Sequence, residues 1–175
     1  MKKTAIVALC VLTAASAGAQ GLAEKTGADA MVGVPPSTED FVKEVARSDM
    51  FEIHSSKLAL KKGDAQAKEF ARHMITDHQK TTAELKGLIK SGKVSVQPPA
   101  DLGQPLQTRL DKLRKETGQD FTSNYDEDQV SAHQDAVSLF GRYAKDGDNP
   151  DLKDWAARTL PTLQKHLEMA QALNK

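Results

Sequence analysis

The chain has 175 residues, of which 39% are hydrophobic and 27% charged, a balance typical of one globular domain. Its formal net charge is zero and aromatic residues make up only 5%, so neither a basic surface nor a stacking platform for nucleic acid is indicated. Cys10 is the single cysteine, which excludes a disulfide within the chain and a thiolate cluster for a metal.

The N-terminus has the order of a secretory signal. Two lysines precede an apolar run over residues 5–15, and the small residues after it favour cleavage after Ala19 or, alternatively, Ala17. The run is too short to cross about 30 Å of hydrocarbon, so we expect no membrane span in the mature chain. Residues 1–19 are therefore predicted to be a signal peptide, and residues 20–36 a flexible lead-in of a periplasmic or otherwise exported protein.

Two long helices are predicted next, separated by a tight turn. Ser37 forms a capping box with Asp40 at the start of the first, and Gly63 ends it. Asp64 then caps a second helix that ends near Gly92. The turn is so short that the two helices should be antiparallel neighbours.

A connection of about 25 residues leads to two further long helices. Three leucines at helical spacing predict a short helix inside the connection. Thr117 and Asp120 predict a capping box that opens a helix reaching about Lys145. Asn149 as cap and Pro150 at the first helical position open the last helix.

Each of the long helices has one apolar face that must be buried. We therefore predict an all-α fold over residues 37–175, an antiparallel four-helix bundle with a long connection between its second and third helices. That connection passes either along the outside of the bundle or across one end.

Titratable residues interrupt the apolar faces. At about 100° per residue, His78, His133 and His166 fall at the centres of the stripes of the last three long helices. The first helix brings Asp49 and Glu52 on its stripe. The three histidines and the two acids lie at similar distances along their helices from the chain reversals, so we expect one polar layer within an apolar core.

Two interpretations of this layer compete. In the first, the histidines pair with neighbouring polar groups such as Gln129 and Tyr125, and only fix helix packing. In the second, they bind one transition-metal ion, because imidazole is a common ligand of zinc, copper and iron and a carboxylate compensates the charge. The predicted ligands are His78, His133 and His166 with Glu52.

Other residues are alternates or supports in the metal interpretation. Asp49 can replace Glu52, Met74 would add a soft ligand for copper(I), and Asp77 either orients a histidine or faces water. Methionine more often simply fills a core. His54 and His73 fall off their stripes and are predicted to be exposed.

The segments FARHMITDHQ, NYDEDQVSAHQDAVSLF and LPTLQKHLEMA resemble a family of exported bacterial proteins of unknown function, often labelled outer-membrane or exported proteins, within the ferritin-like superfamily. The resemblance spans about residues 37–173 and implies a ferritin-like four-helix bundle, but no activity. The positions that match the polar positions of the family are Glu52, Asp77, His78, Tyr125, His133 and His166.

The chain departs from ferritin-like di-iron proteins at the metal ligands. Those sites use a Glu-x-x-His motif on two helices, whereas Ile75, Val130 and Leu163 stand three residues before the histidines here. A di-iron oxidase or iron store is therefore not supported. We expect a non-catalytic or weakly catalytic protein that binds one metal ion or, alternatively, a structural or interaction protein of the envelope. The sequence leaves the protein partner and oligomeric state open.

Overall fold

The computed structural model describes residues 35–173, which form five helices and no strand. The all-helical prediction is confirmed for this part of the chain. The predicted signal peptide and residues 20–34 of the lead-in lie outside the described residues. The helices are α1 Thr38–Lys62, α2 Ala65–Lys90, α3 Gly103–Lys115, α4 Gly118–Asp146 and α5 Pro150–Leu173.

Three of the four predicted helix starts have the expected caps. The side chains of Ser37, Asp64 and Asn149 each accept a hydrogen bond from the backbone N–H three residues later, at 3.1, 2.9 and 3.0 Å. The capping box predicted at Thr117 is wrong, because its side chain makes no such bond. Gly118 begins α4 at a φ of +59°, a left-handed conformation that changes how the backbone enters the helix.

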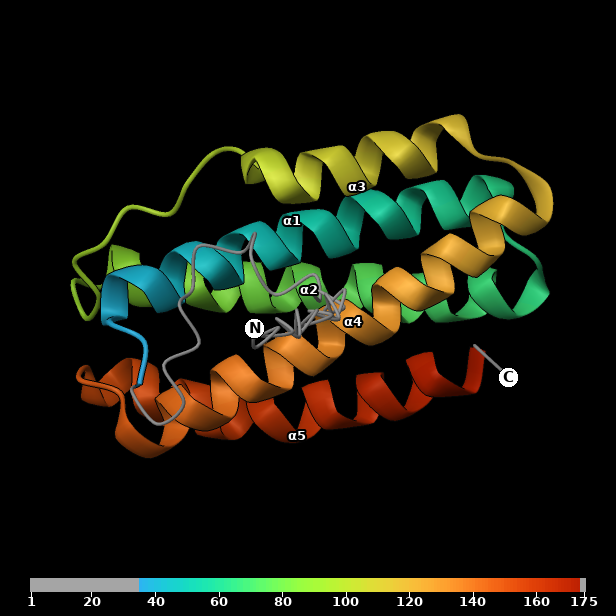
Figure 1. Cartoon of the computed structure of the whole chain (residues 1–175). Helices are drawn as coiled ribbons and strands as arrows, with labels where there is room; N and C mark the ends of the chain where they lie inside the picture. Colours follow the sequence, from blue (N-terminus) through green and yellow to red (C-terminus); the bar gives the residue numbers. More distant parts are fainter. Residues whose placement is uncertain (1–34, 174–175) are drawn as a thin grey trace, which may run out of the picture.

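The four long helices lie side by side, each packed against two neighbours. Helix α1 packs against α2 and α4, and α5 packs against the same two helices. The colours of Figure 1 show α1 and α5 running in one direction and α2 and α4 in the other, so every neighbouring pair is antiparallel. Because α2 and α4 run the same way, the chain must return to the starting end between them, and α3 makes this return along the outside of α1 (Figure 1).

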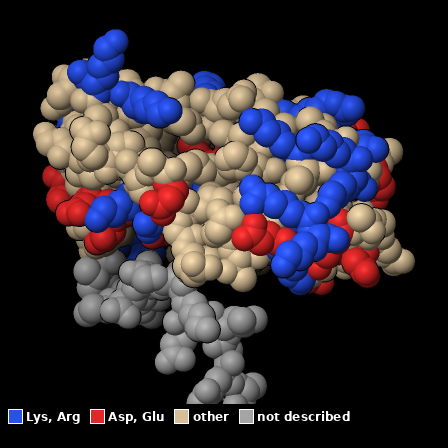
Figure 2. All heavy atoms as spheres, turned by 90° about the horizontal axis from the view of Figure 1, so that it is seen from above, with Lys and Arg blue, Asp and Glu red and all other residues tan. Residues whose placement is uncertain are grey.

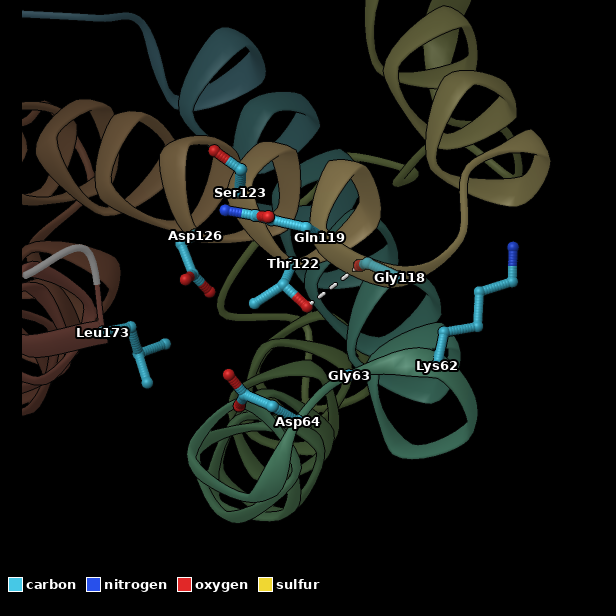
Figure 3. A pocket seen from close by; sticks show the side chains of 9 residues that line it. All are labelled: Lys62, Gly63, Asp64, Gly118, Gln119, Thr122, Ser123, Asp126 and Leu173. Atoms are coloured by element: carbon cyan, nitrogen blue, oxygen red, sulfur yellow. Dashed lines mark hydrogen bonds between the residues drawn. The ribbon is translucent and has the colours of Figure 1, made fainter.

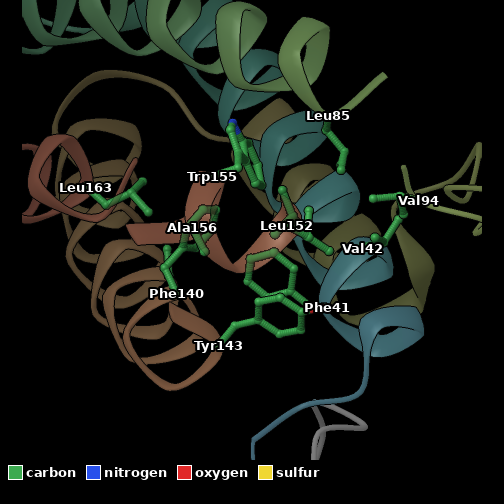
Figure 4. Packing of buried hydrophobic residues seen from close by; sticks show 12 residues of the cluster. Phe41, Val42, Leu85, Val94, Phe140, Tyr143, Leu152, Trp155, Ala156 and Leu163 are labelled. Atoms are coloured by element: carbon green, nitrogen blue, oxygen red, sulfur yellow. The ribbon is translucent and has the colours of Figure 1, made fainter. Parts of the chain in front are cut away.

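Two apolar clusters fill the core. Figure 4 shows the first, where the ring of Phe41 stacks on Tyr143 with centroids 4.1 Å apart and Trp155 packs close by. The second lies toward the other end, and there Phe121 and Tyr125 stack at 5.9 Å. Burying each large apolar side chain stabilises the fold by about 1.5–3 kcal/mol, so these clusters hold the long helices in register.

The described surface carries both signs of charge. Figure 2, which looks onto the α3 side, shows Lys and Arg side chains gathered toward one end with Asp and Glu among them. Three of the basic residues, Lys112, Arg114 and Lys115, lie in the last turn of α3. None of the described helices combines the length and the apolar character that crossing a bilayer requires.

Candidate metal centre

Three buried histidines meet between the two apolar clusters. His78 comes from α2, His133 from α4 and His166 from α5, and the three residues are only 1–3% exposed. The ring centroids are 5.4–5.7 Å apart. One nitrogen of each ring lies within 4.8 Å of a nitrogen of each of the others. The structure therefore brings the three predicted histidines together from three helices.

The ring of His78 is held by Asp49 of α1. Its Nδ1 lies 2.8 Å from Asp49 Oδ1, and a carboxylate at that distance accepts the Nδ1 proton. The hydroxyls of Thr81 and Thr82 also donate to this carboxylate, at 2.9 and 2.8 Å. Sequence reasoning missed this role of the two threonines, although their positions three and four residues after His78 place them on the same helix face.

The other two rings are also held through one nitrogen each. His133 Nδ1 donates to the backbone carbonyl of Gln129 at 2.8 Å, one turn earlier in α4. His166 Nε2 donates to Asp77 Oδ2 of α2 at 2.9 Å. Each acceptor fixes which nitrogen carries the proton in the neutral ring, so the opposite nitrogen presents a lone pair.

These opposite nitrogens are unpartnered. His78 Nε2, His133 Nε2 and His166 Nδ1 are all buried and make no hydrogen bond with the described residues. A buried polar atom without a partner costs about 1–3 kcal/mol, and three at one place need an explanation. Metal-binding histidines typically donate their other ring N–H to a carboxylate or a backbone carbonyl, which is the arrangement of all three rings here.

Burial and neighbouring charges set the protonation of the rings in different directions. Burial, together with the charge of His78, lowers the pKa of His133 to about 3. Burial likewise lowers the pKa of His166, against the hydrogen bond to Asp77. Burial acts in the same sense on His78, but the hydrogen bond and negative charge of Asp49 outweigh it and raise the pKa of His78. Two of the three rings are therefore held neutral, the form that binds metal.

Glu52 lies beside the triad but outside the set of converging nitrogens. Its side chain is 1% exposed, and both carboxylate oxygens are buried without a hydrogen-bond partner. Burial raises the pKa of Glu52 to about 7, whereas the charge of His78 acts to lower it. A cation at the triad would relieve this desolvated carboxylate.

The remaining predicted residues have supporting or packing positions. Asp49 and Asp77 each accept a hydrogen bond from one histidine ring, and the Asp77 side chain is also 39% exposed. Tyr125 exchanges a hydrogen bond with Ser56 at 3.0 Å, and Met74 is fully buried in the second apolar cluster. His54 and His73 are exposed, as predicted.

Two hollows reach the triad from opposite sides. A cavity of about 220 Å³ with mostly apolar walls is bounded by α1, α3 and α4 and reaches Asp49 and His78. A larger groove of about 1060 Å³ follows the seam between α2 and α5 and reaches Asp77 and His166. The two hollows thus reach the carboxylates of Asp49 and Asp77, which hold His78 and His166.

A third pocket lies at the end of the molecule where α1 turns into α2. Figure 3 shows the carboxylates of Asp64 and Asp126 facing the same space. Burial, with the charge of Asp64, raises the pKa of Asp126 to about 6. None of the predicted site residues lines this pocket.

A search of curated protein sequences gave no match. Among solved structures the fold is similar to one described as CopM in the Cu(II)-bound form, with a TM-score of 0.65 and 17% sequence identity. The alignment covers 81% of this chain and 97% of that one, so the likeness extends over nearly the whole helical domain. The model of a family known as a domain of unknown function, DUF4142, matches residues 22–173, and the protein therefore belongs to the DUF4142 family.

Proposed function

We propose that this protein is an exported, ferritin-like four-helix bundle that binds one transition-metal ion through His78, His133 and His166. The observation that carries the proposal is three buried histidines from three helices. Each ring keeps one unpartnered nitrogen, and nitrogens of the three rings come within 4.8 Å of one another. The antiparallel packing of the long helices and the outer path of α3 support the bundle.

The donor set fits such an ion. A metal bound to two nitrogens at about 2.0–2.1 Å holds them no more than about 4.2 Å apart, so nitrogens within 4.8 Å need only small ring movements. Asp49, Asp77 and the Gln129 carbonyl hold the rings from outside. Glu52 supplies a nearby negative charge that compensates the cation.

Copper is the ion that we favour first. Imidazole nitrogens bind copper, zinc and iron, and copper(II) forms the strongest complexes of the divalent series. CopM, whose fold is similar, was solved with Cu(II) bound. The likeness in fold does not itself carry the ligands across at 17% identity, so the choice rests mainly on the nitrogen-rich donor set.

We propose binding rather than catalysis as the main role. The three histidine residues are at most 3% exposed, which suits holding an ion more than turning over a large substrate. The alternative, a histidine layer that only sets packing, would be expected to pair its ring nitrogens. The three unpartnered nitrogens argue against it.

A metal titration tests the proposal. The purified protein is freed of metal with a chelator, mixed with Cu(II), Zn(II) or Fe(II), desalted and analysed for bound ion. We expect one ion per chain for the natural protein and for His54→Ala, which removes an exposed histidine of α1, and none for His133→Leu. Failure of the natural protein to retain any of the three ions, or equal retention by His133→Leu, would overturn the proposal.

A further inference from the structure

His166 faces both the triad and the groove between α2 and α5. Its Nδ1 is one of the three unpartnered ring nitrogens of the triad, and its Nε2 donates to Asp77. The His166 side chain is 4% exposed, whereas that of Asp77 is 39% exposed. The pair thus forms the boundary between the buried centre and the open groove.

Two hydrogen bonds fix how α2 and α5 are aligned along the groove. Asp77 meets His166 at 2.9 Å, and Glu84 accepts a hydrogen bond from Trp155 Nε1 at 2.8 Å. Because the helices are antiparallel, the residue one turn before Asp77 and the residue nearly one turn after His166 lie at the same end of the groove. These residues are His73 and Met169, and both line the groove.

This end of the groove gathers side chains that bind transition metals. His73 is exposed and offers an imidazole, Met169 offers a thioether, and Asp77 offers a carboxylate. His73 and Asp77 are four residues apart on α2 and therefore lie on one face of the helix. Only Oδ2 of Asp77 is used by His166, so Oδ1 is free of protein hydrogen bonds among the described residues.

The charges of the groove favour a cation at the same end. Among the residues that line the groove, Lys80 and Arg158 lie on the other side of the Asp77–His166 pair from His73, and Lys165 stands next to His166. Lys80 is also 3.9 Å from the carboxylate of Glu84. A cation at His73 therefore has the Asp77 carboxylate one turn away on the same helix face.

We propose that His73, Asp77 and Met169 form an uptake site through which a transition-metal ion reaches the histidine triad. The inference rests on the proposed function and adds the route to it. His73 and Met169 hold the ion weakly beside the Asp77–His166 pair. Because Nε2 of His166 carries the proton that Asp77 accepts, the ion passes from Asp77 to Nδ1 of His166 only when the ring turns away from the carboxylate. The uptake site raises the local concentration of the ion, so it acts on the rate of loading and leaves the final occupancy unchanged.

The rate of copper uptake by the metal-free full-length protein tests this route. Trp155 is the single tryptophan and lines the groove, so quenching of its fluorescence by Cu(II) in a stopped-flow instrument reports loading. The variants are His73→Ala and Met169→Leu, with His54→Ala as the matched control for loss of an exposed histidine. Bound copper is then measured after desalting.

We expect His73→Ala to load about tenfold more slowly, Met169→Leu to load more slowly as well, and every protein to reach one ion per chain. Loading of both variants at the natural rate would overturn the route while leaving the proposed function intact. A lower final occupancy in His73→Ala would also overturn it, because His73 would then be a ligand of the resident ion. Absence of copper from the natural protein would overturn the proposed function and the route with it.

Discussion

Replacement of His133 by leucine should change how the stability of the metal-free protein depends on pH. His133 is 1% exposed, and burial lowers its pKa from 6.5 to about 3. Because the folded pKa lies below the unfolded one, the unfolded chain takes up the proton first as the pH falls. The contribution of His133 to stability is thus present above pH 6.5 and is lost as the pH falls toward 3.

The size of the effect follows from that window. At pH 5 the pH is about 1.5 units below the pKa of the histidine in the unfolded chain, and each unit corresponds to about 1.4 kcal/mol. Protonation of the unfolded chain at His133 therefore lowers the free energy of unfolding by about 2 kcal/mol. Leucine has a similar volume and no proton to take up. The variant should therefore gain about 2 kcal/mol over the natural chain between pH 7.5 and pH 5.

The free energy of unfolding is measured by urea titration followed by helical circular dichroism at both pH values, after removal of metal. At pH 7.5 we expect the variant to be at least as stable as the natural protein, because the unpartnered Nε2 is removed. His73→Leu, at an exposed position, controls for loss of a histidine as such. A variant less stable by the same amount at both pH values would refute the reasoning and favour a packing role for the ring.

Substitutions at three further positions test the surroundings of the triad. Asp49→Ala removes the acceptor of His78 and of two threonine hydroxyls, and should lower the free energy of unfolding by about 2–4 kcal/mol, with Asp49→Asn less damaging in the same urea titration. Burial raises the pKa of Glu52 in the folded protein to about 7, so its contribution to stability is present below pH 4.5 and is lost as the pH rises through 7. Between pH 4 and pH 8, Glu52→Gln should therefore gain up to about 3 kcal/mol in free energy of unfolding over the natural chain. A difference in free energy of unfolding that is the same at both pH values would contradict this. Asp77→Asn should weaken copper binding about tenfold by loosening His166, measured by competition with a chelator of known affinity, whereas equal affinity would show that the hydrogen bond does not position the ring.

Much of the fold could be predicted from local sequence signals. Caps such as Ser37 and Asp64 and the stop at Gly63 act within one helical turn, so their effect is visible in the sequence. The cap at Thr117 failed because Gly118 adopts a left-handed conformation, which the sequence permits but does not require. The outer path of α3 depends on packing between distant segments and was left open for that reason.

The candidate site was predictable in its members but not in its hydrogen bonds. Helical periodicity placed His78, His133 and His166 in the core, because each interrupts an apolar stripe. Their partners depend on side-chain geometry across helices. Gln129 was named as a partner, and it is the backbone carbonyl of Gln129 that accepts the hydrogen bond from His133. Glu52 is not among the residues whose ligand atoms converge.

Elemental analysis of the natural protein is the most direct test of a metal centre in the triad. The protein is purified without an affinity tag from the cells that make it, and its metal content is compared with that of His133→Leu after circular dichroism has shown both to be helical. We predict close to one transition-metal ion per chain in the natural protein and almost none in the variant. A natural protein that carries no metal and takes up no copper, zinc or iron would contradict the metal centre and leave the histidines as a packing layer.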